Sequence, residues 1–125
     1  MAIKTITLTG TGPQPTVDVF IGQAQYGEYT VTVKTTAGER IIQAEGDNAD
    51  DIADTFPLKT PLAELNQCYL SWWITVRAPT AGGGQFYFAR VAVKQGEDIV
   101  GEPFEYSGPL ADTKNIIDVI QLVVV

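Results

Sequence analysis

Apolar residues alternate with polar ones at every second position through most of this 125-residue chain. Successive side chains of a β-strand point to opposite faces of a sheet, so a period of two predicts strands that bury one face. Residues 28–34 are the clearest example, because Tyr29, Val31 and Val33 alternate there with polar side chains. No segment shows the period of an amphipathic helix, so we expect an all-β protein with no helix longer than about two turns.

Turn-forming residues divide the apolar segments into about eight or nine short strands. This pattern is typical of an antiparallel two-layer β-sandwich with a jelly-roll or immunoglobulin-like topology. The length corresponds to one domain, residues 1–125, and no linker divides it. The expected strands cover residues 3–9, 17–21, 28–34, 40–45, 55–58, 69–77, 85–95, 99–106 and 113–125.

The composition argues against several classes of function. The chain has no histidine, which removes the commonest general base and the commonest zinc ligand. It has 15 acidic and 8 basic residues, a net charge of −7, and its lysines are scattered along the chain. Binding to nucleic acids or to acidic lipids needs clustered basic residues. We therefore expect a non-catalytic protein without a cofactor, a nucleic-acid partner or a membrane partner.

The single cysteine, Cys68, cannot form a disulfide within the chain. Its neighbours in the sequence carry no positive charge that would lower the pKa of the thiol, so we expect a small buried apolar side chain. The first residues lack the apolar core of a signal peptide, and no apolar stretch is long enough to span a membrane. These features predict a soluble protein made in the cytoplasm and leave its final location open.

Two adjacent tryptophans, Trp72 and Trp73, must point to opposite faces of any strand that contains them. Leu70, Ile74 and Val76 share the face of Trp72, which predicts that Trp72 lies in the core. We predict that Trp73 lies outside the core, because its face is otherwise polar. The residues that share this face are Ser71, Thr75 and Arg77.

Three interpretations of Trp73 are open. Tryptophan and arginine often anchor protein interfaces, so Trp73 and Arg77 indicate contact with a protein partner. Alternatively, the indole ring is a platform on which a sugar stacks, with Ser71, Arg77 and Tyr87 beside it. A singly exposed apolar side chain is also common in proteins where it has no such role.

The expected strand 85–95 changes phase along its length. Phe86 and Phe88 are in phase with each other, whereas Val91 and Val93 are in the opposite phase. A β-bulge near residues 89–90 is the simpler explanation, because it would bring all four side chains into one core. Without a bulge, one of the two pairs must be covered from outside the sheet.

Residues 46–54 are rich in carboxylates, and calcium takes oxygen ligands from loops of this composition. The spacing does not match an EF-hand loop, which needs glycine at its sixth position and glutamate at its twelfth. A solvated acidic turn explains the composition equally well. We therefore assign no metal site, and expect folding to depend little on calcium.

Residues 116–125 are apolar on both faces of the expected C-terminal strand. Such a strand is normally covered on both sides, whereas the outer face of a two-layer sandwich meets water. A second subunit is the simplest third layer, with Phe20, Trp73, Val119 and Val123 as contact residues. The sequence thus predicts a non-catalytic β-sandwich protein that self-associates or packs into a larger assembly. The alternative is a carbohydrate-binding, lectin-like module.

Overall fold

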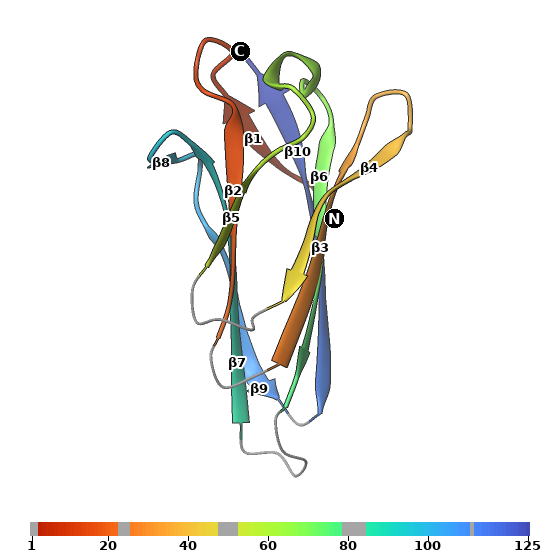
Figure 1. Ribbon diagram of the computed structural model, residues 1–125, viewed down its shortest axis with the longest axis vertical. Helices are drawn as coiled ribbons and strands as arrows, with labels where there is room; N and C mark the ends of the chain where they lie inside the picture. Colours follow the sequence, from red (N-terminus) through yellow and green to blue (C-terminus); the bar gives the residue numbers. More distant parts are fainter. Residues whose placement is uncertain (1–2, 23–25, 48–52, 79–84, 111) are drawn as a thin grey trace.

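The computed structural model describes residues 3–22, 26–47, 53–78, 85–110 and 112–125, which form two five-stranded β-sheets (Figure 1). The all-β prediction is confirmed for these residues, whose one helical piece is the short 3-10 turn Leu62–Glu64. No helix in the described ranges is long and apolar enough to cross a membrane. The strands are β1 (Lys4–Leu8), β2 (Pro15–Ile21), β3 (Tyr26–Lys34), β4 (Arg40–Asp47), β5 (Asp54–Pro57), β6 (Tyr69–Arg77), β7 (Gln85–Gln95), β8 (Asp98–Ile99), β9 (Phe104–Leu110) and β10 (Thr113–Val124).

Sheet A has the strand order β1-β10-β6-β3-β4. Sheet B has the order β5-β2-β7-β8, and β9 also pairs with β7. All strand pairs are antiparallel except β1 and β10, which run parallel. The described chain forms ten strands, one of only two residues, so neither the expected number of strands nor the expected topology is confirmed.

The inner faces of the two sheets meet in one hydrophobic core (Figure 1). Trp72 is 1% exposed whereas Trp73 is 56% exposed, so the predicted orientation of this strand is confirmed. Each fully buried valine, leucine or isoleucine side chain of the core contributes roughly 1.5–3 kcal/mol to folding. The centre of the core is formed by Leu70, Trp72, Ile74 and Val76 of sheet A and by Val17, Val19, Val91 and Val93 of sheet B.

A chain of polar groups joins the two sheets inside the sandwich. The Trp72 Nε1 donates to the Tyr106 hydroxyl at 3.0 Å, and this hydroxyl donates to Asp118 Oδ2 at 2.6 Å. Burial and the hydrogen bond to Asp118 raise the pKa of Tyr106 well above its usual value of 10.0. Cys68 is buried, as predicted, and burial raises the pKa of its thiol.

The predicted bulge in β7 is wrong. β7 pairs with β2 and with β9 in unbroken register, so its two phases stay on opposite faces. Phe88 therefore lies on the outer face of sheet B, where its ring centroid is 6.1 Å from that of Phe20. Phe86 shares this outer face, so both phenylalanines of β7 lie outside the core.

Three predicted boundaries also differ. Residues 107–109 were expected to end a strand but lie within β9, where Pro109 is tolerated because β9 is an edge strand. The expected strand 99–106 is instead split between β8 and β9, with Gly101 at a φ of +71° between them. β4 and β5 extend into the acidic segment, whose residues 48–52 lie outside the described residues together with the calcium hypothesis that concerns them.

Candidate functional site

The outer face of sheet A exposes a compact group of large apolar side chains. Trp73 of β6 and Ile117 of β10 are directly opposite each other, and Ile117 is 71% exposed. In the adjacent register, Val119 lies opposite Ser71, which lies opposite Thr32, and Thr32 lies opposite Ile42. Ile42, on the edge strand β4, is 50% exposed. We call the surface formed by Trp73, Ile117, Val119 and Ile42, with the hydroxyl side chains between them, the sheet A patch.

The Trp73 ring is held by its neighbours on the sheet. Its Nε1 donates to Asn115 Oδ1 at 3.3 Å, and the Thr75 hydroxyl donates to the same oxygen at 2.8 Å. The polar edge of the indole therefore has a partner within the subunit. What the ring presents outward is mainly apolar surface, which favours contact with another apolar or aromatic group.

Small hydroxyl side chains fill the space between the larger residues of the patch. Ser71 lies on β6, while Thr30 and Thr32 lie beside it on β3. None of them carries a charge or a long side chain, so the middle of this face has low relief. Charged residues lie around it, with Lys34 and Arg40 beyond one end.

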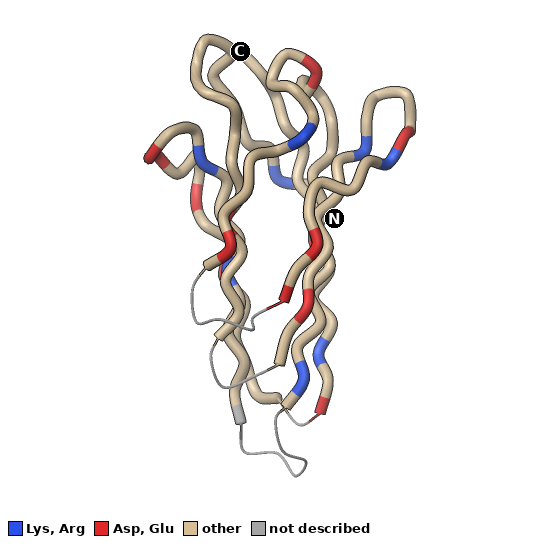
Figure 2. Tube along the Cα trace, in the orientation of Figure 1, with Lys and Arg blue, Asp and Glu red and all other residues tan. Residues whose placement is uncertain are grey.

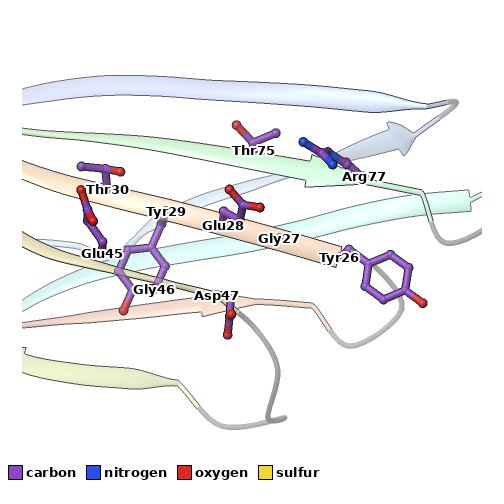
Figure 3. A pocket seen from close by; sticks show the side chains of 10 residues that line it. All are labelled: Tyr26, Gly27, Glu28, Tyr29, Thr30, Glu45, Gly46, Asp47, Thr75 and Arg77. Carbon is purple, nitrogen blue, oxygen red and sulfur yellow. The ribbon is translucent and has the colours of Figure 1, made fainter.

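A polar hollow of about 820 Å³ lies beside the patch, at the other end of β3, β4 and β6 (Figure 3). Glu28, Thr30, Glu45 and Thr75 project to one side of these strands, whereas the Tyr29 ring lies on the other side (Figure 3). The Tyr29 hydroxyl donates to Asp54 Oδ2 at 2.8 Å, which ties β3 to β5 across the sandwich. The other residues that line the polar hollow are Tyr26, Gly27, Gly46, Asp47 and Arg77.

A second hollow, of about 530 Å³, lies at the opposite end of the patch. Ile3, Tyr69 and Val119 form apolar parts of its lining, while Lys34 and Arg40 supply positive charge and Asp118 supplies a carboxylate. Trp73 lines neither hollow. In the described part of the chain no three acidic, cysteine or histidine side chains are placed to hold a metal ion.

The structure brings together only some of the predicted site residues. Trp73 shares the outer face of sheet A with the predicted residues Ser71, Arg77, Val119 and Val123. Arg77 is the next residue after Thr75 on the same face of β6, and it lines the polar hollow. Ser71 and Val119 belong to the patch.

Phe20 and Tyr87 do not join this surface. Phe20 lies on the outer face of sheet B, on the opposite side of the sandwich from Trp73. Tyr87 points inward and packs against the core, so it is not available beside Trp73 as a sugar ligand. Alternation along a strand indicates which residues share a face of that strand, but it does not indicate which sheet contains the strand.

Sequence reasoning missed Ile42, because the alternation in β4 is interrupted. The register between β3 and β4 shifts next to Gln43, which turns inward and is 2% exposed. Its Oε1 accepts hydrogen bonds from the backbone N–H groups of Lys59 at 2.6 Å and Thr60 at 3.2 Å. The available signal was the break in phase between Ile41 and Ala44, which a bulge explains.

No protein-family model matches the sequence, and no curated protein or solved structure matches it either. The functional argument therefore depends on the geometry of the two outer faces.

Proposed function

We propose that this protein is a non-catalytic interaction protein that self-associates or packs into a larger assembly through the sheet A patch. The observation that carries this proposal is the directly opposed pair of Trp73 and Ile117, both strongly exposed on a strand pair at the middle of the sheet. The indole N–H already has an acceptor in Asn115. A second apolar surface is therefore a better partner for this ring than a hydrogen-bonding ligand.

The layout of the face supports the same function. Interfaces typically have an apolar centre depleted in charge and a polar rim. Here the apolar and hydroxyl residues lie mainly on the central strands, and Lys34, Arg40 and Glu28 lie towards the ends of the strands, while Glu45 lies on the edge strand β4 in the register of Trp73. Five strands and a nine-residue central strand give a face on the order of 700 Å², close to the ~800 Å² that each partner contributes to a standard interface.

The choice between an immunoglobulin-like and a jelly-roll topology stays a prediction. The order β10-β6-β3-β4 resembles the G-F-C-C′ order of an immunoglobulin variable sheet. Strands β7 to β9 intervene between β6 and β10 along the chain, which is unlike the direct connection between strands F and G. The similar strand order favours the immunoglobulin-like alternative over the jelly roll for sheet A, although the connection between β6 and β10 differs.

A dilution series in sedimentation velocity tests the proposed function. We expect an oligomer at micromolar concentration, and weaker association after Val119→Thr and Val123→Thr, because both changes keep strand propensity but add a hydroxyl to the outer face. Val19→Thr, in the core, is the matched control and should instead lower the stability of the subunit. A strictly monomeric protein contradicts the proposal, and unfolding by the outer-face changes would place that face in the core.

A carbohydrate-binding role is the second candidate. It is favoured by the polar hollow next to Trp73, where Arg77, Glu28 and Tyr26 offer charged and aromatic groups to a sugar. Because Trp73 does not line the hollow, this role requires Tyr26 rather than Trp73 as the stacking ring. Binding across a panel of sugars that is lost in Tyr26→Ala and kept in Trp73→Ala would favour it over assembly.

A further inference from the structure

The indole ring of Trp73 is tied to the neighbouring strand through one amide oxygen. Its Nε1 lies 3.3 Å from Asn115 Oδ1, and the Thr75 hydroxyl donates to the same oxygen at 2.8 Å. Asn115 and Thr75 lie directly opposite each other on β10 and β6. An indole N–H can only donate, so the atom of Asn115 that faces it must be the amide oxygen rather than the amide nitrogen. One side chain of β10 thus accepts hydrogen bonds from two residues of β6.

This bond determines the direction in which the ring leans. Asn115 lies in the register next to that of Trp73, on the side away from Ser71. The second hollow is lined by Ile117, which is directly opposite Trp73, and by Ser71, but not by Trp73 itself. The ring therefore leans away from the second hollow. The apolar and hydroxyl lining of that hollow stays open beside the ring, so a partner can contact both.

The acceptor that holds the ring is uncharged, although Figure 2 shows charged positions along the strands of sheet A. On the outer face, the carboxylates nearest to Trp73 in register are those of Glu28 on β3 and Glu45 on β4. Both lie on the β3 side of the ring, whereas Asn115 lies on the β10 side. Salt screens interactions between exposed charges, so it should have little effect on a bond to a neutral amide.

The identity of residue 115 fits this role. Asparagine is depleted in β-strands, and β10 is otherwise rich in β-branched residues. Asn115 is exposed, so burial does not explain its presence there. Its amide supplies an acceptor beside an apolar surface, whereas a carboxylate in the same place would add a charge that loses water on contact.

We propose that Asn115 is the positioning residue for Trp73 in the sheet A patch, and that Thr75 acts on Trp73 through Asn115. This inference rests on the proposed function. An exposed tryptophan that rotates freely loses that freedom when a partner binds, which weakens binding by about threefold to tenfold for one side chain. The bond to Asn115 restricts the ring before contact, so association does not have to supply this ordering.

The motion of the ring is tested in the diluted, monomeric subunit. Time-resolved fluorescence anisotropy separates fast rotation of an exposed tryptophan from tumbling of the protein, and the buried Trp72 adds little fast rotation. Asn115→Ala should increase the amplitude of the fast component, whereas Asn115→Asp, which keeps an acceptor oxygen, should restore about the original value. Thr75→Val should give a smaller increase, and Glu28→Gln is the control that should give none.

A double-mutant cycle tests whether Asn115 acts on association through Trp73. Sedimentation velocity over a dilution series should show that Asn115→Ala weakens association by about threefold or more. Trp73→Phe keeps an apolar ring but has no N–H to donate, so in this background Asn115→Ala should cause no further weakening. Thr113→Val removes a different polar group from the outer face of β10, and this matched control should not weaken association.

Each variant must also keep the fold of the original protein. Circular dichroism verifies this, and the replacements at Asn115 should be tolerated because its side chain is exposed. Asn115→Ser, whose hydroxyl is too short to replace the amide oxygen, is the second variant if Asn115→Ala does not fold. It should change the motion of the ring and the association in the same direction.

Two outcomes overturn the positioning role while leaving the proposed function intact. One is that Asn115→Ala leaves either the fast component or the association unchanged. The other is that Asn115→Ala weakens association equally in the Trp73→Phe background, which would mean that Asn115 contacts the partner itself. In both cases Trp73→Ser should still abolish association. If Trp73→Ser has no effect on association, or the original protein is monomeric, the proposed function fails together with this inference.

Discussion

The outer faces of the two sheets differ in how far their own residues complete them. On sheet B, Phe20 and Phe88 contact each other, and Lys94 Nζ lies 2.7 Å from Asp18 Oδ2. The Thr55 hydroxyl also donates to Asp18 Oδ1 at 2.7 Å, so this carboxylate is bonded on both oxygens. On sheet A, large apolar side chains stand exposed, and Lys34 lies directly opposite Arg40.

The contrast shows that an exposed ring alone is a weaker indication of a contact surface than several exposed apolar residues beside a like-charge pair. Sheet B also exposes an aromatic side chain, since Phe86 is 69% exposed near the end of β7. Among the described residues, only sheet A combines exposed apolar side chains in adjacent registers with a like-charge pair, Lys34 and Arg40, directly opposite each other. A face with both properties gains more from a partner than a face such as that of sheet B around Asp18, where the carboxylate is already paired with Lys94.

The two adjacent tryptophans give the largest test of this difference. Trp72→Ala should lower the free energy of unfolding by about 3–5 kcal/mol, because it leaves a cavity in the core and removes the donor to Tyr106. Trp73→Ala should change the stability of the isolated subunit far less, while it weakens association. Urea unfolding at high dilution measures both, and equal losses of stability would show that the sheet A face belongs to the subunit's own core.

A smaller effect should come from the aromatic pair of sheet B. Phe20→Ala removes a half-buried ring contact with Phe88, so we expect a loss of about 1–2 kcal/mol in the free energy of unfolding. The oligomeric state should not change, because this face is on the other side of the sandwich. Sedimentation of the variant beside Trp73→Ala is the measurement, and a weakened oligomer in Phe20→Ala would assign sheet B to the interface.

The smallest effects concern single charges and should have opposite signs on the two faces. Lys34→Glu converts a like-charge pair with Arg40 into an attractive one, so the isolated subunit should gain a few tenths of a kcal/mol, about the size expected for exposed cross-strand pairs. Lys94→Glu breaks the ion pair with Asp18 and should lower stability by a similar amount. Urea titrations at low salt compare them, and a loss of stability in both variants would argue against repulsion on sheet A.

The sequence predicts local features of the fold well, because they depend on neighbouring residues. The alternation around Trp72 and Trp73 correctly assigned the two faces of β6, and the absence of helical periodicity correctly indicated an all-β chain. The isolated Cys68 was correctly expected to be buried. Each of these predictions needs only side-chain patterns among residues that are close in the sequence.

The candidate site was harder to predict, because its residues meet through pairing between distant segments. β10 lies between β1 and β6, and no pattern in the sequence specifies that Ile117 faces Trp73. The phase change in β7 suggested a bulge that is absent, while the actual bulge at Gln43 was marked only by the break in phase between Ile41 and Ala44. Bulges depend on what the extra residue contacts, and Gln43 contacts Lys59 and Thr60 from another part of the chain.

The parallel pairing of β1 with β10 has a mechanical consequence. The two strands align five residue pairs, from Lys4 with Ile120 to Leu8 with Val124. In a parallel pair, the start of one strand and the end of the other lie at opposite ends of the ladder. A force that pulls the chain before β1 away from the chain after β10 therefore acts along the strands. It loads the rungs of the ladder together in shear, whereas an antiparallel hairpin pulled at its open end would unzip one rung at a time.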